Sequence, residues 1–198
     1  MRNTVRNTLV AACGLAVAAS AASAAGTIQG KVICRSASDC TGALVYIEKI
    51  PGQTVAPKAD AVMDQLNLRF VPHVLPVVVG TKVAFPNGDE VRHNVFSPSP
   101  AKRFNLGIYP RGMTKYLVFD KPGVVDVLCN VHAEMSAYIV VIESPYVAQV
   151  APNGTYALKD VPAGKYVIRA WREELKEQLR EVTLGEGGSL TLDFDLRQ

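Results

Sequence analysis

The sequence predicts an all-β fold in which a Greek-key β-sandwich is followed by a smaller β-sandwich module. Three observations lead to this prediction. Short runs rich in Val, Ile, Phe and Tyr recur along the chain, with lengths typical of strands. Turn-forming residues separate the runs, as at residues 86–89 and 121–123. Near the C-terminus, apolar and polar residues alternate with the period of two that a half-buried strand shows. Such short strands with regular turns favour a sandwich or a Greek-key barrel.

The first group of strands ends near residue 143. Residues 51–60 contain the Pro, Gly and Ala residues of a linker or long loop, and they divide this group in two. The strands expected on either side of the linker are residues 27–33, 43–47, 66–71, 77–79, 82–85, 95–96, 116–119, 124–128 and 138–142.

A second group begins after Ser144-Pro145. The Asn153-Gly154 pair predicts a hairpin turn before its first strand. Residues 172–182 are ambiguous, because Leu175 and Leu179 fit a helical spacing while both flanks are strands. We expect the charged end of a hairpin there. The strands expected in this group are residues 155–158, 165–171 and 190–196.

The first 24 residues have the features of an export signal. Arg2 and Arg6 give a positive start, residues 9–19 form an apolar run, and Ala22-Ser23-Ala24 forms a cleavage site of small residues. A membrane anchor is less favoured because the run is too short to span a bilayer. Lipid attachment at Cys13 is less favoured because few apolar residues precede it. We therefore expect a periplasmic protein with no membrane span after signal removal.

Composition also limits the class of partner. The chain has 21 basic and 18 acidic side chains. Removal of Arg2 and Arg6 with the signal leaves 19 basic side chains and a net charge of +1. A nucleic-acid-binding domain usually shows a basic stripe and a high pI. We expect no nucleic-acid partner.

Three cysteines remain after removal of the signal. Cys34 and Cys40 flank a short polar loop, and an exported protein enters an oxidising compartment. We expect these two to form a disulfide, with a pair of reduced thiols as the alternative. Cys129 is then left over beside a histidine.

The segment from Cys129 to Met135 places a thiolate, an imidazole and a thioether three residues apart in turn, with His132 between the two sulfur residues. Upstream, His93 follows a predicted turn and leads into a strand. Two histidines, one cysteine and a weak axial methionine are the ligand set of an electron-transfer copper site. Thiolate and thioether stabilise Cu(I), whereas imidazole accepts both Cu(I) and Cu(II). The sequence thus predicts one mononuclear copper ion held by His93, Cys129, His132 and Met135.

Each ligand has a more ordinary interpretation when it is taken alone. A single cysteine can be a small buried hydrophobe, and single histidine or methionine residues are mostly structural. The combination favours ligation, because two of the three histidines in the chain fall in this arrangement. His73, the third, is expected to be structural or exposed. Zinc is disfavoured because a thioether suits it poorly. A binuclear copper centre would need a second cysteine in the loop, and a Cys-His hydrolase would need an orienting group and an oxyanion hole.

The order of the ligands resembles that of the cupredoxins. His93-Asn94 precedes Cys129-x2-His132-x2-Met135, and this short loop is similar to that of amicyanin. The stretches at residues 71–85 and 119–129 resemble a plastocyanin-like domain, so the resemblance covers about residues 60–143. It implies that His93, Cys129, His132 and Met135 are the copper ligands. It also implies that hydrogen bonds of Asn94 tie the histidine-bearing strand to the cysteine loop.

Two positions depart from the cupredoxin pattern. Val131 stands where a proline often precedes the second histidine, and Glu134 stands where small or apolar residues are usual. A carboxylate at that position favours Cu(II) and is the alternative to Met135 as the fourth ligand. We expect Glu134 to point to solvent and Met135 to be the axial ligand.

The C-terminal segment resembles the carboxypeptidase regulatory-like sandwich, on residues 153–156 and 161–166. The strands at residues 27–33 and 43–47 either complete the copper-domain sheet or belong to this second sandwich. The segments expected are therefore a signal peptide at 1–24, N-terminal strands and a linker at 25–59, a cupredoxin copper domain at 60–143, and a β-module at 144–198.

The function expected from these features is electron transfer by a periplasmic type 1 copper protein. Its one copper ion would cycle between Cu(I) and Cu(II) and exchange electrons with other periplasmic redox proteins, and we expect no enzymatic activity. The alternative is a copper-binding carrier or storage protein without a redox circuit. A structural β-module that retained the site is a third possibility.

Overall fold

A computed structural model of the chain describes residues 24–36 and 40–197. The expected signal peptide at residues 1–24 lies outside the described residues except for Ala24. Almost all regular structure in the described part is β-strand, so the predicted all-β fold is confirmed. The described residues contain no helix that is both long and apolar enough to cross a membrane.

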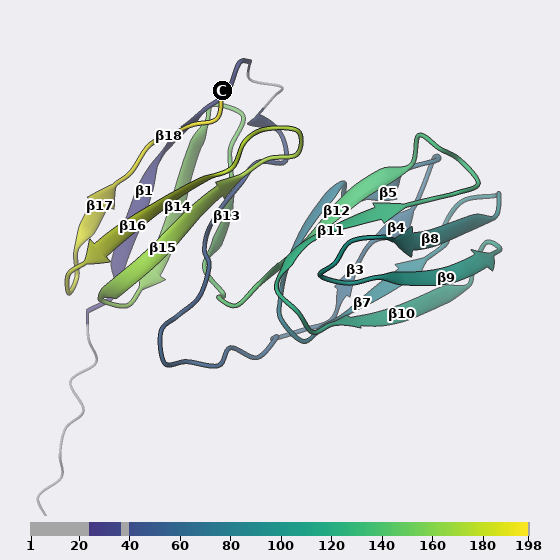
Figure 1. Cartoon of the computed structure of the whole chain (residues 1–198), viewed down its shortest axis with the longest axis horizontal. Coiled ribbons are helices and arrows are strands. Elements are labelled where there is room, and N and C mark those ends of the chain that lie inside the picture. Colours follow the sequence, from purple (N-terminus) through teal and green to yellow (C-terminus); the bar gives the residue numbers. More distant parts are fainter. Residues whose placement is uncertain (1–23, 37–39, 198) are drawn as a thin grey trace, which may run out of the picture.

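The candidate ligands belong to one β-sandwich, here called the site sandwich (Figure 1). A five-stranded sheet forms one layer, in the order β6 (Val74–Val78), β12 (Ser136–Ile142), β11 (Gly123–Leu128), β8 (His93–Ser97) and β9 (Phe104–Tyr109). A three-stranded sheet forms the other layer, in the order β10 (Thr114–Phe119), β7 (Thr81–Pro86) and β3 (Ala61–Val62).

Side chains from the two layers meet in a continuous core. Along β7, Thr81, Val83 and Phe85 are buried while their neighbours face outward, as a period of two requires. Cys129 and Met135 belong to the same core cluster as Val83 and Phe85. The loop between β11 and β12 is therefore anchored to the sandwich interior through two of the candidate ligands.

The remaining strands build a second sandwich. One sheet contains β14 (Thr155–Val161), β1 (Gly26–Ile33) and β17 (Ser189–Thr191), with β18 (Phe194–Asp195) also paired to β1. The other contains β13 (Val147–Gln149), β2 (Leu44–Ile47), β15 (Gly164–Trp171) and β16 (Gln178–Leu184). Because β1 and β2 pair with strands that follow residue 146, the site sandwich is an insertion between β2 and β13 of this second sandwich. The N-terminal strands β1 and β2 therefore belong to the second sandwich and do not complete a sheet of the site sandwich.

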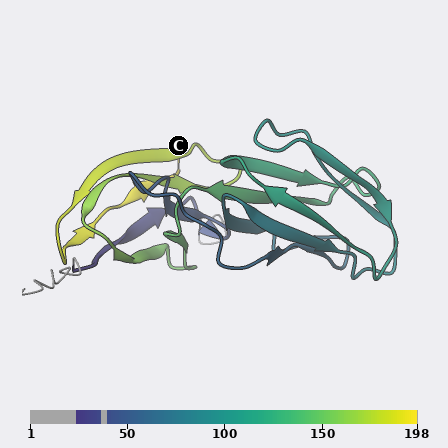
Figure 2. The same ribbon diagram turned by 90° about the horizontal axis from the view of Figure 1, so that it is seen from below.

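The two sandwiches lie side by side along the long axis of the molecule (Figure 2). A third cluster of buried side chains joins them, here called the interface cluster. Its members come from β2 and β15 of the second sandwich and from β6 and β12 of the site sandwich: Leu44, Tyr46, Val74, Val140, Ile142 and Trp171. The chain passes between the two sandwiches next to this cluster, where Lys49 and Glu143 form an isolated β-bridge.

Residues 66–71 are not the single strand that their composition predicts. They form most of a hairpin, in which β4 (Asp64–Gln65) pairs with β5 (Phe70–Val71). Leu66 and Arg69 exchange backbone hydrogen bonds of 2.9 and 3.1 Å, and the two residues between them have φ values of 53° and 58°. Two consecutive left-handed residues make a type I′ turn, which Asn favours at its first position. Apolar residues on both sides of Asn67 obscured this turn in the sequence.

Other boundaries also differ from the prediction. The expected strand at residues 190–196 is divided into β17 and β18, and at the break the Lys31 amide donates to Oδ1 of the Asp193 side chain at 2.7 Å. The strand β9 was not predicted, because its residues are mostly half-exposed and lack a buried face. The ambiguous segment at residues 172–182 is the end of the β15–β16 hairpin, as expected.

Candidate metal centre

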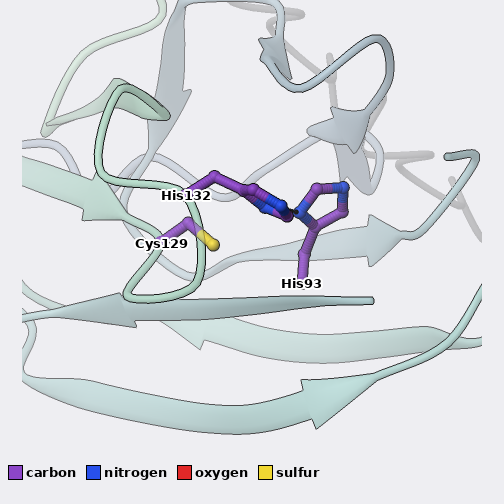
Figure 3. Close-up of side chains that lie close together, drawn as sticks. All are labelled: His93, Cys129 and His132. Carbon is purple, nitrogen blue, oxygen red and sulfur yellow. Dashed lines mark hydrogen bonds between the residues drawn. The ribbon is translucent and has the colours of Figure 1, made fainter. Parts of the chain in front are cut away.

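The structure brings three of the four predicted ligands together at one end of the site sandwich (Figure 3). The ligand atoms of His93, Cys129 and His132 all lie within 4.8 Å of one another. His93 comes from the first residue of β8, and the other two come from the loop that joins β11 to β12. This end of the sandwich therefore brings together one imidazole from a strand and a thiol and a second imidazole from a single loop.

Backbone hydrogen bonds close the loop that carries the other ligands. The Cys129 amide donates to the Met135 carbonyl at 3.2 Å, and the Met135 amide donates to the His132 carbonyl at 3.1 Å. Met135 is buried, with 1% of its surface exposed, and it packs in the same core cluster as Cys129. Glu134 is exposed, so the expectation that it faces solvent is confirmed. The loop thus holds Met135 inward and Glu134 outward.

His93 is completely buried, and both of its ring nitrogens have polar neighbours. Its Nδ1 lies 3.0 Å from Nδ1 of His132, and its Nε2 lies 2.8 Å from Oδ2 of Asp89. The two imidazole rings meet edge to face, with 4.9 Å between centroids. One side of the His93 ring therefore faces the cluster, and the other side faces a carboxylate.

Tyr109 supports His93 from the neighbouring strand, since the two residues are paired in the β8–β9 ladder. Its hydroxyl donates to the Phe85 carbonyl at 2.9 Å and accepts a hydrogen bond from Gln65 at 2.7 Å. Burial raises the pKa of Tyr109 to about 12, although the hydrogen bond from Gln65 opposes this shift. Tyr109 is thus a neutral, fully bonded part of the wall beside the cluster.

Cys129 is the only free cysteine among the described residues, and it is buried. The Val131 amide donates to its Sγ at 3.4 Å, a contact that stabilises negative charge on sulfur. Asn94, next to His93, donates from its side chain to Oδ1 of Asn130 at 3.1 Å. This hydrogen bond ties β8 to the cysteine loop, as the resemblance implied for Asn94. The predicted disulfide between Cys34 and Cys40 is confirmed.

Asp89 is a part of the site that the sequence analysis missed. Residues 86–89 were predicted only as a turn, whereas the carboxylate of Asp89 contacts His93 and is 12% exposed. Burial raises the pKa of Asp89, but hydrogen bonds from the Leu68 amide, His93 and the Asn67 amide outweigh burial and hold the pKa below its usual value. The sequence offered one indication of this role, since Asp89 stands four positions before the candidate ligand His93.

His73 lies outside the cluster, as expected. Its exposed ring is hydrogen bonded to the Ser136 carbonyl at 3.1 Å and to Glu173 of the second sandwich at 2.7 Å. His73 therefore connects the two sandwiches and takes no part in the candidate centre.

The donor set fits copper. Two imidazole nitrogens and a cysteine sulfur converge in a largely buried position, and such a set of intermediate and soft donors is typical of copper. His93, Cys129 and His132 are the residues that would hold the ion. Met135 lies buried on the same closed loop.

Comparison with known proteins gives matches only at the level of structure. No family model matches the chain, and no curated protein matches it. A copper-containing nitrite reductase from Thermus scotoductus SA-01 is 25% identical with a TM-score of 0.41, over 48% of this chain and 28% of that one. A reduced mutant of amicyanin is 24% identical with a TM-score of 0.40, over 44% of this chain and 85% of that one. A purple cupredoxin from Nitrosopumilus maritimus is 26% identical with a TM-score of 0.38, over 41% of this chain and 99% of that one.

The matches cover less than half of this chain, and the chain spans about a quarter of the nitrite reductase. The function of this chain therefore has to be inferred from its own donor set and from the surroundings of that set.

Proposed function

We propose that this protein is an exported type 1 copper protein that carries electrons. One copper ion would be held by His93, Cys129 and His132, with Met135 as a fourth, weaker ligand. The observation that carries the proposal is the convergence of two imidazoles and a buried thiol within 4.8 Å. When bound, copper supplies the one-electron chemistry, by cycling between Cu(I) and Cu(II).

The surroundings suit a site that changes little between two oxidation states. His93 is fixed on a strand by Asp89 and by its pairing with Tyr109. The cysteine loop is fixed by its own backbone hydrogen bonds and by the Asn94–Asn130 contact. Rigid ligands of mixed softness satisfy both Cu(I) and Cu(II) without rearrangement, so electron transfer requires little reorganisation.

The ligands differ in their access to solvent. His93 and Cys129 are buried, whereas His132 is partly exposed and is flanked by the exposed Val131 and Ala133. The ring edge of His132 is therefore the proposed exit for electrons toward other periplasmic redox proteins. The disulfide of Cys34 with Cys40 supports an oxidising, periplasmic location. We propose no enzymatic activity, because electron transfer requires only the ion and its rigid ligands.

The test is the optical and electron paramagnetic resonance spectrum of the copper-loaded mature protein. We expect an intense visible band from charge transfer between the Cys129 thiolate and Cu(II), together with a reversible potential. Cys129→Ser should abolish the band. A matched control, in which Cys34 and Cys40 are both replaced by Ser, should retain it because that disulfide lies in the other sandwich. A colourless, tight Cu(I) site would instead indicate a copper carrier, and a band that survives Cys129→Ser would refute the assignment.

A further inference from the structure

The carboxylate of Asp89 accepts hydrogen bonds from three directions. Its Oδ1 accepts from the Asn67 amide at 2.5 Å. Its Oδ2 accepts from the Leu68 amide at 2.8 Å and faces Nε2 of His93 at 2.8 Å. The Asp89 amide in turn donates to Oδ1 of Asn87 at 3.0 Å, which fixes the backbone of the turn. Asp89 thus joins the β4–β5 turn to a buried candidate ligand.

This contact determines which nitrogen of His93 carries the proton. An ionised carboxylate has no hydrogen to donate, so the 2.8 Å contact requires a hydrogen on Nε2 of His93. A neutral imidazole then has its lone pair on Nδ1, which is the nitrogen that faces His132. The side of the ring that faces the cluster is therefore the side that can donate electrons to a metal.

The β4–β5 hairpin holds this carboxylate in place. The left-handed conformations of Asn67 and Leu68 direct two successive amides of the turn toward Asp89. Asp64, at the start of the hairpin, accepts from the Gly88 amide at 3.1 Å and from the Gln65 amide at 2.7 Å. Asp64 therefore braces the same loop without touching His93.

We propose that Asp89 is a positioning residue that locks His93 in its Nε2–H tautomer, and that the type I′ turn of the β4–β5 hairpin holds Asp89 for this task. The proposal deepens the function proposed above and rests on it wherever copper is concerned. A carboxylate that accepts from the remote nitrogen of a histidine ligand fixes the ring and raises its basicity. Loss of such a partner typically weakens metal binding by about 10- to 100-fold.

The most informative variant is Asp89→Asn, which keeps the size of the side chain. Either orientation of the new amide places an NH₂ group against a backbone N–H of the turn or against the His93 ring. The amide can also donate to Nε2, which releases the ring to adopt the other tautomer. Asp64→Asn is the matched control, because it makes the same charge change at a carboxylate that joins the same hairpin to the same turn but does not contact His93. Asp89→Glu tests whether a carboxylate alone restores the effect.

Two readouts separate the proposal from the function on which it rests. The first is ¹⁵N NMR of the histidine side chains in the metal-free protein, at a pH at which the rings are neutral. We expect His93 to be in the Nε2–H form in the natural protein and in Asp64→Asn, and to be a mixture of tautomers in Asp89→Asn. The second is the Kd for copper, measured by competition with a chelator, which should rise about 10- to 100-fold in Asp89→Asn alone.

The possible outcomes decide both questions. An unchanged His93 tautomer and an unchanged copper Kd in Asp89→Asn would overturn the positioning role. Equal effects in Asp64→Asn and Asp89→Asn would also overturn it, because the carboxylates would then act only on the loop. Partial recovery of tautomer and Kd in Asp89→Glu would support it. If the natural protein binds no copper, the proposed function fails, and the tautomer measurement still decides whether Asp89 positions His93.

Discussion

Met135 and Glu134 are neighbours in the sequence, but they lie in opposite environments. Met135 is buried in the core of the site sandwich, and Glu134 is exposed. Loop closure explains the difference, because both backbone groups of Met135 are hydrogen bonded within the loop. Glu134, one position before Met135 on this tight loop, is therefore directed outward.

These two residues should affect the reduction potential in opposite directions. Met135→Gln should lower the potential, because a harder oxygen donor favours Cu(II) over Cu(I). Glu134→Gln should raise it modestly, because it removes a nearby negative charge that favours the more positive ion. Voltammetry of both variants at one pH and one salt concentration measures the two shifts. An unchanged potential in Met135→Gln, combined with loss of the visible band in Glu134→Gln, would show that the carboxylate is the ligand.

At this scale the sequence indicates the members of the candidate centre better than it indicates their hydrogen-bonding partners. Cys129, His132 and Met135 lie within one short loop, so their spacing alone indicates that their side chains converge on one point. Asp89 depends on contacts with the hairpin at residues 64–71, and no local pattern shows that this hairpin packs against the turn. Residues that act across the fold in this way become visible only in three dimensions.

The strand β1 lies in the middle of one sheet of the second sandwich. It pairs with β14 on one side and with β17 and β18 on the other. A Cβ atom added at Gly30 would lie 2.0 Å from the Leu192 carbonyl oxygen, which is a backbone atom that cannot turn aside. Glycine is therefore required there so that the neighbouring backbone can approach closely.

Gly30→Ala should destabilise the protein by about 1–3 kcal/mol or more, as overpacking does in other cores. The control is Gly185→Ala, where an added Cβ meets no atom within 4 Å and φ is not left-handed. Urea denaturation of the two variants, with equal m values, gives the free energies of unfolding. Equal stability of the two variants would mean that β1 and the segment at Leu192 can separate at little cost.

The elements were predicted best where burial alternates strictly. The strands β7 and β12 follow apolar patterns with a period of two or nearly continuous runs, and their positions agree with the prediction. The β4–β5 turn was missed because its left-handed residues include Leu68, which carries no turn signal. The strand β9 was missed because it lies at the edge of its sheet and most of its side chains are only half-buried.

The interface cluster links the stabilities of the two sandwiches. It includes Trp171, which is the only tryptophan in the chain and which meets Tyr138 edge to face at 5.5 Å between centroids. Tryptophan fluorescence therefore reports on the junction between the sandwiches. The copper band, by contrast, would report on the far end of the site sandwich.

In the natural protein, we expect the two signals to change together on unfolding, since coincident transitions indicate a single cooperative unit. Ile142→Ala removes a buried contact of the interface cluster and should cost about 2–5 kcal/mol. It should also separate the fluorescence transition from the copper transition. Ile139→Ala is the control, because Ile139 lies on the same strand but packs in the site core. Its two transitions should stay coincident, and separation in both variants would contradict the role of the interface cluster.

The hydrogen bond between Glu173 and His73 adds a smaller link between the sandwiches. Burial raises the pKa of Glu173, but the hydrogen bonds from His73 and Arg172 outweigh it and lower the pKa. A depressed carboxyl pKa contributes stability above the unfolded value, and this contribution is lost as pH falls through the folded value. Glu173→Gln should therefore cost about 0.2–1 kcal/mol near neutral pH. The difference from the natural protein should vanish in acid, as measured by urea denaturation at a series of pH values. A stability difference that persists at a pH where the Glu173 carboxyl is protonated would contradict this role.

The insertion of one sandwich into the other also sets an order of assembly. Pairing of β2 with β13 must close a loop of about one hundred residues, which is entropically costly while that loop is unstructured. The site sandwich is continuous in the sequence, so it can form first, and its folding brings Lys49 and Glu143 together. The large loop then shrinks to a short connection before β2 meets its partners. Folding of the site sandwich therefore promotes folding of the second sandwich. Mutations that slow folding of the site sandwich will also delay the second sandwich, although the second sandwich contains none of the candidate ligands.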